Sequence, residues 1–307
     1  MLPTAKPVLH TCLAALTLAA ACAAAAGAGG AAERVAGPLR EAGPGGGAFV
    51  GYVDSATLPV QPFGGWPGIS VRVLGEDAAS GRLALRAEFP AGWRLERAPR
   101  VPQSLEIVLL DGALGFGAER LGRHDFAFVP PGSQAPPLSS PAGGAALLFF
   151  DPPASDAAAV ERQRERGAYV SRFDPRRWQP ASLARSAGAT IDLQVMHLKK
   201  DPFTSARTWY VRLGPGMRMP WEVHSMVEEG YVMQGRYTLA ECLPARTVIG
   251  DYREGGYFWR PGGIPHSGPE SGPDGAVMWL QRSPVALDVA LYQQCAAGRA
   301  SAPLLPP

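Results

Sequence analysis

Short runs of apolar and β-branched residues dominate this chain of 307 residues. Each run spans four to seven residues, and clusters of Gly, Pro, Asp and Ser separate the runs at short intervals. The 37 glycines and 31 prolines suit many tight turns between strands. The pattern therefore predicts an all-β sandwich or barrel. Representative runs are residues 83–89, 105–110, 126–129, 208–213, 229–233 and 257–260.

Two stretches are predicted to form short helices. The first runs from Asp156 to Arg166 and ends at Gly167, so it would link the two halves of the chain. The second has Pro284 in its first turn and extends to about Ala297 near the C-terminus.

Sequence landmarks of the first half recur in the second half. They keep one order and nearly one spacing: Gly92 and Gly216 are 124 residues apart, Gly112 and Gly235 are 123 apart, and Pro130 and Pro261 are 131 apart. This agreement indicates an internal duplication, with one β domain in each half.

The first 24 residues have the pattern of a secretory signal peptide. Lys6 is the one charged residue of this segment, and an Ala-rich apolar run follows it. The residues before Cys22 resemble a bacterial lipobox, although Ala19 stands where Leu is usual. Lipidation at Cys22 and ordinary cleavage further along are alternatives, and both predict export to the periplasm. The Ala-, Gly- and Pro-rich residues 25–47 are expected to be a flexible tether.

Overall charge and the absence of several motifs exclude common functions. Lys and Arg total 29 against 27 for Asp and Glu, so the net charge of +2 predicts no nucleic-acid partner. The sequence has no G-x-S-x-G, no phosphate-binding loop and no basic stripe interleaved with aromatic residues. Membrane attachment is expected only through a lipid anchor at Cys22.

A cluster of polar residues in the second half resembles the first motif of the cupin superfamily, G-x5-H-x-H-x3,4-E-x6-G. Gly216, Glu222, His224, Glu228 and Gly235 keep every spacing of this motif. Glu222 stands where the family has its first His. Because Glu222 and His224 are two residues apart, they share one face of a strand.

The second motif of the superfamily, G-x5-P-x-G-x2-H-x3-N, is matched further along. Gly255, Pro261, Gly263 and His266 occupy its positions, and Glu270 replaces the final Asn. The phrase around Pro261 also resembles a bacterial two-cupin family of unknown function and, more distantly, the cupin of ChrR-type anti-sigma factors. The predicted signal peptide argues against an anti-sigma role, because sigma factors stay in the cytoplasm.

Two imidazoles and two carboxylates inside one barrel predict a divalent metal site. Buried carboxylates without partners are strongly unfavourable, and a cation offsets their charge. Mixed nitrogen and oxygen donors favour Mn, Fe, Zn, Ni or Co. We predict Glu222, His224, Glu228 and His266 as ligands; the alternative for Glu222 is a solvated strand residue at the barrel mouth. Glu229 is a second candidate for the carboxylate position.

Further residues near these motifs have candidate roles. Glu229 could move protons as a carboxylate near the ion, and Arg260 could pair with a buried carboxylate or with the substrate. Either Phe258 and Arg260 or the alternating Tyr257 and Trp259 should line the interior. His197, in an apolar strand, is interpreted as structural.

The corresponding positions of the first half lack metal ligands. Alignment on Gly92 places Ala98 and Arg100 at the ligand positions, Glu106 is one residue out of register, and Ala135 occupies the position of the second-motif His. The first barrel is therefore predicted to keep the scaffold without a metal.

The resemblance and the repeat together predict an all-β bicupin, with two double-stranded β-helix (jelly-roll) barrels. The resemblance and the N-terminal pattern together lead us to expect an exported metal-dependent enzyme that acts on a small oxygenated substrate, of dioxygenase, decarboxylase or isomerase type. The alternative is a non-enzymatic periplasmic binding or sensing protein. A homodimer is also expected. The predicted organisation is signal peptide 1–24, tether 25–47, metal-free cupin 48–152, linker 153–178, metal-binding cupin 179–298 and tail 299–307.

Two cysteines, Cys242 and Cys295, remain beyond the signal region. Export would place them in an oxidising compartment, which permits a disulfide between them. Two separate thiols are the alternative.

Overall fold

The structure is a computed structural model of the chain. The described residues are 32–44, 47–78, 80–100, 102–181, 191–267, 270–272, 275–284, 288, 290–292, 295–296 and 299–300. The predicted signal peptide, residues 1–24, lies outside them.

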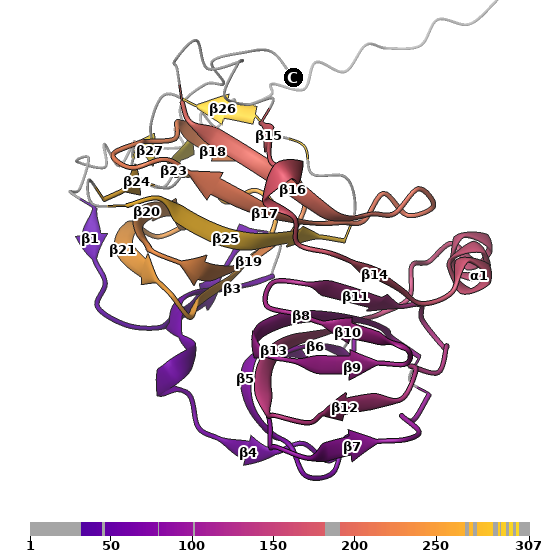
Figure 1. The fold of residues 1–307 in the computed structure, drawn as a ribbon. Helices are drawn as coiled ribbons and strands as arrows, with labels where there is room; N and C mark the ends of the chain where they lie inside the picture. Colours follow the sequence, from indigo (N-terminus) through magenta and orange to yellow (C-terminus); the bar gives the residue numbers. More distant parts are fainter. Residues whose placement is uncertain are drawn as a thin grey trace, which may run out of the picture.

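Two β barrels lie one above the other (Figure 1), and the single helix among the described residues lies beside the N-terminal barrel. The N-terminal barrel pairs a seven-stranded sheet with a four-stranded sheet. In spatial order, the larger sheet contains β14 (Tyr169–Ser171), β11 (Phe126–Val129), β8 (Ser104–Gly112), β13 (Gly144–Asp151), β6 (Arg82–Phe89), β5 (Ser70–Asp77) and β4 (Gln61–Pro62). The smaller sheet contains β10 (Glu119–Leu121), β9 (Leu114–Phe116), β12 (Leu138–Ser140) and β7 (Trp93–Leu95).

The C-terminal barrel has the same two-sheet design. Its eight-stranded sheet is ordered β15 (Gln179–Pro180), β16 (Leu193–Lys200), β17 (Arg207–Leu213), β25 (Val277–Ser283), β19 (Glu228–Gln234), β22 (Gly256–Arg260), β3 (Ala48–Asp54) and β2 (Leu39–Ala42). Its second sheet contains β1 (Glu33–Arg34), β21 (Thr247–Arg253), β20 (Arg236–Cys242), β23 (His266–Ser267), β18 (Trp221–Val223) and β26 (Ala290–Tyr292), with β24 (Glu270–Ser271) on β20.

The N-terminal segment belongs to the C-terminal barrel, which corrects two predicted boundaries. β1 pairs in parallel with β21, and β2 forms a hairpin with β3, which in turn pairs with β22. Part of the predicted tether 25–47 is therefore ordered, and β3 is not the first strand of the N-terminal barrel. Composition favoured a tether because isolated Ala- and Gly-rich segments bury little apolar surface. Here the backbone of this segment gains sheet hydrogen bonds from the distant barrel.

One predicted helix is confirmed, and the other is wrong. The confirmed helix does not link the two halves, because it connects β13 to β14 of the N-terminal sheet, so part of the predicted linker 153–178 belongs to the N-terminal barrel. Helix α1 (Ala157–Arg166) begins where the Asp156 side chain accepts hydrogen bonds from Ala158 N and Ala159 N, and Gly167 ends it with a positive φ of 78°. The predicted C-terminal helix is replaced by β26 and β27 (Cys295–Ala296), and β28 (Arg299–Ala300) lies in the predicted tail and pairs with β27. β26 pairs with β18, which offers an open sheet edge that local sequence patterns do not reveal. Single 3-10 turns span Ser55–Thr57 and Pro175–Arg177.

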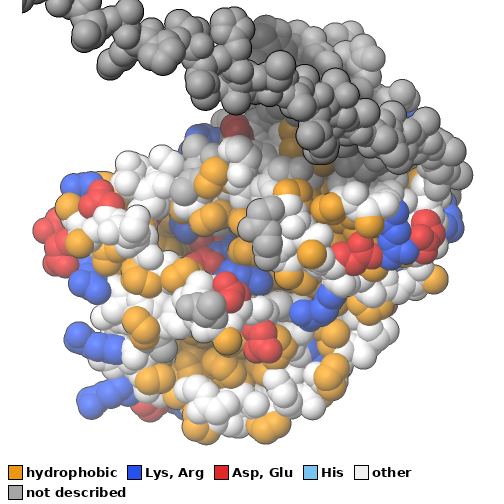
Figure 2. Space-filling model, turned by 180° about the vertical axis from the view of Figure 1, so that it is seen from behind, with side chains coloured by type: hydrophobic (Ala, Val, Ile, Leu, Met, Phe, Trp, Pro, Cys, Tyr) orange, Lys and Arg blue, Asp and Glu red, His pale blue; other side chains and the backbone are white. Residues whose placement is uncertain are grey.

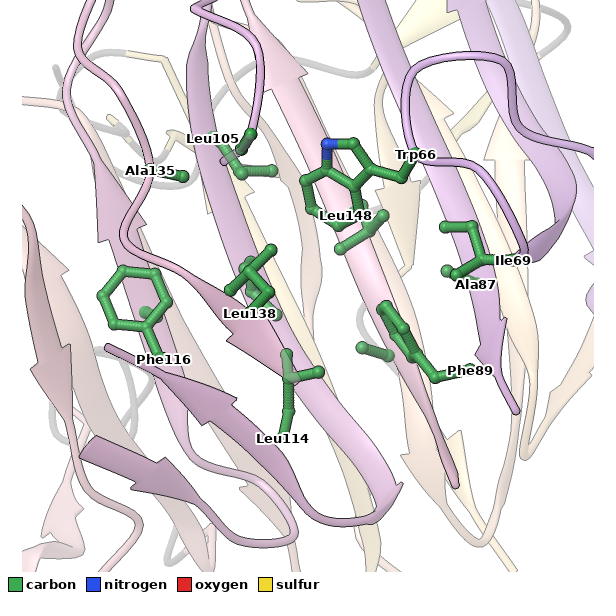
Figure 3. Packing of buried hydrophobic residues seen from close by; sticks show 14 of the residues in the cluster. Trp66, Ile69, Ala87, Phe89, Leu105, Leu114, Phe116, Ala135, Leu138 and Leu148 are labelled. Carbon is green, nitrogen blue, oxygen red and sulfur yellow. The ribbon is translucent and has the colours of Figure 1, made fainter. Parts of the chain in front are cut away.

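Apolar side chains fill the interior of the N-terminal barrel. Trp66, Phe89 and Leu148 meet at its centre (Figure 3), and Ala98 and Ala135 are part of the same buried cluster. Two of the ligand positions of the first half are thus occupied by buried alanines. Arg100, at a third position, is exposed. This barrel therefore has a packed core where the other barrel has polar residues.

A second buried layer joins the two barrels. Strand alternation turns Glu106 and Val108 of β8 away from their own barrel core and toward the C-terminal barrel. There they meet a cluster that combines residues of both halves. Glu106 is fully buried and forms ion pairs with Lys199 and Arg282 of the other barrel. The interface thus combines apolar packing with buried charge pairs.

On the side shown in Figure 2, positive and negative side chains are interspersed. Among the described residues, no helix is both long and apolar enough to cross a membrane.

Candidate metal centre

Three predicted ligands converge in the C-terminal barrel. One possible donor atom from each of Glu222, His224 and His266 lies within 4.8 Å of the others, and all three residues are buried. Glu222 on β18 pairs directly with His266 on β23, so their side chains start from opposite positions of two adjacent strands. His224 follows Glu222 by two residues and returns to the same side.

Backbone carbonyls fix the orientation of both imidazoles. His224 Nδ1 contacts the carbonyl oxygen of Asp288, and His266 Nδ1 lies 3.1 Å from the carbonyl oxygen of Ile264. A carbonyl can only accept, so each Nδ1 carries a proton, and the neutral form of each ring presents a lone pair at Nε2. Nε2 of His224 is buried without a hydrogen-bond partner. This arrangement is the one that metal-binding histidines use, and the site therefore fits a cation.

Glu228, the fourth predicted ligand, lies beside the three but is engaged elsewhere. Its Oε2 is 3.7 Å from His224 Nε2 and 3.6 Å from His266 Nε2. Arg260 Nη1 donates to this Oε2, and Gln281 Nε2 donates to Oε1. The carboxylate thus borders the cluster and is held by two donors.

Arg260 pairs with two buried carboxylates. Besides Glu228 it binds Glu241, to which Nε donates at 2.9 Å and Nη2 at 2.6 Å. Sequence analysis missed Glu241. Its signal was available, because it follows Tyr237 and Leu239 at two-residue intervals on the interior face of β20. Sequence analysis also missed Gln281, although it follows Val277 and Trp279 at two-residue intervals on the interior face of β25.

Burial opposes charge on several members of this group. Burial raises the pKa of Glu222, although His224 and Arg260 oppose the shift. Burial also raises the pKa of Glu241 against the effect of Arg260. For His266, burial and the positive charge of Arg260 lower the pKa well below its ordinary value. A neutral, proton-free Nε2 on His266 is thus favoured, as a metal ligand requires.

The net charge of the group suits one divalent cation. Apart from the histidines, three carboxylates, Glu222, Glu228 and Glu241, face one guanidinium, Arg260. The buried group therefore has two negative charges in excess when its acids are ionised. A divalent ion would balance them, and the oxygen and nitrogen donors suit Mn, Fe, Zn, Ni or Co.

A cavity of about 220 Å³ adjoins these residues. Phe258 and Arg260 line it, whereas Tyr257 and Trp259 face the other barrel. His197, interpreted as structural from the sequence, also lines the cavity, and burial with nearby Lys200 lowers its pKa to about 4. The remaining walls are mostly apolar and include Leu193, Val195, Trp209, Val211, Met219, Tyr237, Leu239 and Trp279.

Glu229 is not part of this site, which corrects its predicted catalytic role. Adjacent residues of a strand point to opposite faces, so Glu229 lies on the far side of β19 from Glu228. Its carboxylate accepts hydrogen bonds from Tyr257 Oη at 2.7 Å, from Arg82 Nη1 at 3.1 Å and from Arg282 Nη1. Glu229 therefore belongs to the interface between the barrels.

Solved structures resemble this chain over both barrels. A proposed glyoxylate-induced protein from Pseudomonas aeruginosa has a TM-score of 0.56 and 16% identity, covering 73% of this chain and 83% of its own. Oxalate decarboxylase from Lactobacillus farciminis, in a formate complex, has a TM-score of 0.55 and 11% identity over 78% and 87% of the two chains. A proposed dioxygenase from Nostoc punctiforme has a TM-score of 0.54 and 16% identity over 79% and 86%.

This chain has the bicupin fold. The prediction of two jelly-roll barrels is confirmed. No family model matches the sequence, and no curated protein matches it. The bicupin neighbours include a decarboxylase and a proposed dioxygenase, and at 11–16% identity they show the fold of this chain. The distant likeness to ChrR-type cupins stays a prediction.

Proposed function

We propose that this bicupin is an exported, metal-dependent enzyme that acts on a small oxygenated organic substrate in its C-terminal barrel. The observation that carries the proposal is the convergence of Glu222, His224 and His266 beside a cavity. Both histidines present Nε2 lone pairs, and a closed structural site would have no adjoining space for a substrate.

The cavity indicates which kind of substrate to expect. Its volume of about 220 Å³ is below the roughly 300–1,000 Å³ usual for small-molecule sites, so the substrate is small. Trp209, Trp279 and Phe258 would contact its apolar part and exclude water, and its oxygens would face the polar end with His266 and Glu222. A homodimer remains a separate expectation.

The residues of the site have distinct tasks in this proposal. Glu222, His224 and His266 would hold the ion, which when bound supplies Lewis-acid or dioxygen-activating chemistry. The carbonyls of Asp288 and Ile264 keep the two imidazoles oriented. The activities named for the neighbours, decarboxylation and a proposed dioxygenation, are the first reaction types to consider.

The test combines metal content with turnover. Protein loaded in turn with Mn, Fe, Zn and Ni is incubated with flavonols, keto acids and oxalate, while oxygen uptake and products are followed. His266→Ala is expected to lose metal, thermal stability and turnover, whereas Arg100→Ala, an exposed substitution in the other barrel, keeps all three. If the protein carries no stoichiometric metal after any of these incubations, the proposal is contradicted. Saturable binding without turnover would identify a binding protein instead.

Export is the second part of the proposal. It rests on the N-terminal pattern and on Cys242, which is disulfide-bonded as expected in an oxidising compartment. The side chain of Cys295, its predicted partner, lies outside the described residues. Mass spectrometry of protein from the native cell should find an N-terminus at or after Cys22, with a diacylglycerol adduct in the lipoprotein case. An intact Met1 or Lys6 would contradict export.

A further inference from the structure

The cavity beside the metal centre has a second charged end, which is formed by Arg207 on β17. At the first end, Arg260 pairs with Glu228, and Glu222 Oε1 lies 3.5 Å from His266 Nε2. Arg207 also lines the cavity, but it has no ion pair within the part of the chain that the structure describes. The cavity wall therefore includes one positive charge that no described carboxylate balances.

The register of the sheet separates Arg207 from the metal centre. Arg207 pairs with Ser283 on β25, and Arg282 of the same strand pairs on its other side with Glu229 of β19. Antiparallel pairing continued by one residue places Glu228 level with Ser283. Glu228 and Arg207 thus lie in one row, and two strand spacings put their backbones about 10 Å apart. A ligand that contacts both ends of the cavity therefore needs a polar group at each of its own ends.

Further cations surround the Arg207 end of the cavity. Lys200 on β16 lies directly opposite Arg207 on β17, and like charges at such positions destabilise a sheet. Arg177 donates from Nη2 to the carbonyl oxygen of His197 on β16. Burial lowers the pKa of His197, and the three cations lower it further. The protein thus keeps a group of mutually repelling charges at this end, and a bound anion would relieve the repulsion.

His197 adds an unsatisfied polar atom to the same end. It pairs across the sheet with Trp209, which follows Arg207 by two residues and belongs to the interior face of β17. Its Nδ1 is buried and has no hydrogen-bond partner among the described residues. Buried polar atoms are nearly always hydrogen-bonded, so the partner of this atom is expected to come from what fills the cavity.

We infer that Arg207 is a specificity-determining residue that binds a carboxylate of the substrate. The substrate class is a small organic acid whose carboxylate is separated from its metal-facing oxygens by a short carbon chain. Trp209 and Trp279, which also line the cavity, would contact those carbons. Oxalate is a poorer fit, because its two carboxyl groups are joined directly. This inference rests on the proposed function, since it assigns the substrate of the same site.

Glutarate is the test ligand, because it has a carboxylate at each end of a short carbon chain. Pentane-1,5-diol is the matched neutral ligand with the same number of carbons. Isothermal titration measures both ligands on metal-loaded and on metal-free protein, for wild type, Arg207→Gln and Arg212→Gln. Arg212 is the control, because it lies on the same strand, donates to Gln194 and does not line the cavity.

We expect the wild type to bind glutarate at least about tenfold more tightly than the diol. Arg207→Gln should weaken glutarate binding by at least about tenfold and leave diol binding unchanged, because hydrogen bonds between ionised groups are among the strongest. Arg212→Gln should bind both ligands as the wild type does. Arg207→Gln also removes the like-charge contact with Lys200 and breaks no described ion pair, so its Tm should equal or exceed that of the wild type.

The outcomes separate this inference from the proposed function. If no metal binds but metal-free protein binds glutarate through Arg207, the metal-dependent enzyme is contradicted and the carboxylate site stands. If metal binds and Arg207→Gln keeps the wild-type affinity for glutarate, the inference is overturned and the proposed function is unaffected. The inference is also overturned if the wild type binds glutarate no better than the diol or not at all, or if Arg207→Gln lowers Tm, as loss of a purely structural residue would.

Discussion

Replacing Arg282 with Met should destabilise the junction between the barrels. Arg282 is 5% exposed, and its guanidinium contacts Glu106, Glu229 and Asp151. Met has similar length and no charge, so the substitution keeps much of the packing. It leaves Glu106 and Glu229, which are 0% and 2% exposed, each without one cationic partner. Uncompensated buried charge is the dominant cost.

The magnitude follows from the partners that remain. Breaking a buried ion pair typically costs about 3–5 kcal/mol. Because Glu106 keeps Lys199 and Glu229 keeps Arg82 as partners, we expect the free energy of unfolding to fall by about 3 kcal/mol, the lower end of that range. At about 2–4 °C per kcal/mol, Tm should fall by roughly 6–12 °C. The control is Arg176→Met. Its side chain is 89% exposed and paired with Asp174, so the substitution should leave Tm nearly unchanged.

The pH dependence gives an independent measurement on the same variant. Burial by itself raises the pKa of Glu106, but Arg282 and Lys199 outweigh it and lower the pKa to about 2. A depressed folded-state pKa adds stability above the unfolded value of 4.5, and this stability is lost as pH falls from there toward 2. The acid limb of the Tm profile in this range should therefore be shallower in Arg282→Met than in wild type.

Thermal unfolding of the variants, followed by circular dichroism from pH 2 to 7, checks both expectations. The double variant Glu106→Gln/Arg282→Met should recover part of the loss, because one uncompensated charge is gone. An Arg282→Met loss no larger than that of Arg176→Met would refute the reasoning. Absence of any recovery in the double variant would show that lost packing, rather than charge, sets the cost.

Two further predictions concern the C-terminal barrel. Gly262→Ala should lower metal affinity and reduce the free energy of unfolding by about 1–3 kcal/mol, because a Cβ there would overlap the backbone carbonyl of Ser225 and displace the turn before His266. Isothermal titration measures the affinity and thermal unfolding measures the stability; an unchanged affinity would contradict the prediction. Cys242→Ser should reduce the free energy of unfolding by about 2–5 kcal/mol, because it removes the disulfide. Dithiothreitol should lower the Tm of the wild type and leave that of the variant unchanged; equal sensitivity of both proteins would contradict the prediction.

Short-range sequence patterns determined much of the secondary structure and part of the candidate metal site. Apolar runs and turns specify strands, the Asp156 cap and Gly167 delimit α1, and the duplication sets two barrels. The three residues that converge were also predictable. Glu222 and His224 share a face by alternation, and the turn before His266 follows from its prolines and glycines. Apart from the duplication and the pairing of Glu222 with His266, each of these features depends on residues close together in the chain.

Tertiary pairing decided the rest. Nothing local to residues 33–54 indicates that their partners are β21 and β22, some two hundred residues later, or that β26 completes the edge of β18. The opposite roles of Glu228 and Glu229 also appeared only in the fold. Alternation separates their side chains, but whether each then meets an ion site or Arg282 depends on which barrel packs against which face. The pairing of distant strands depends on the apolar surface buried and the charges paired in the whole fold, and no short segment of the sequence specifies these.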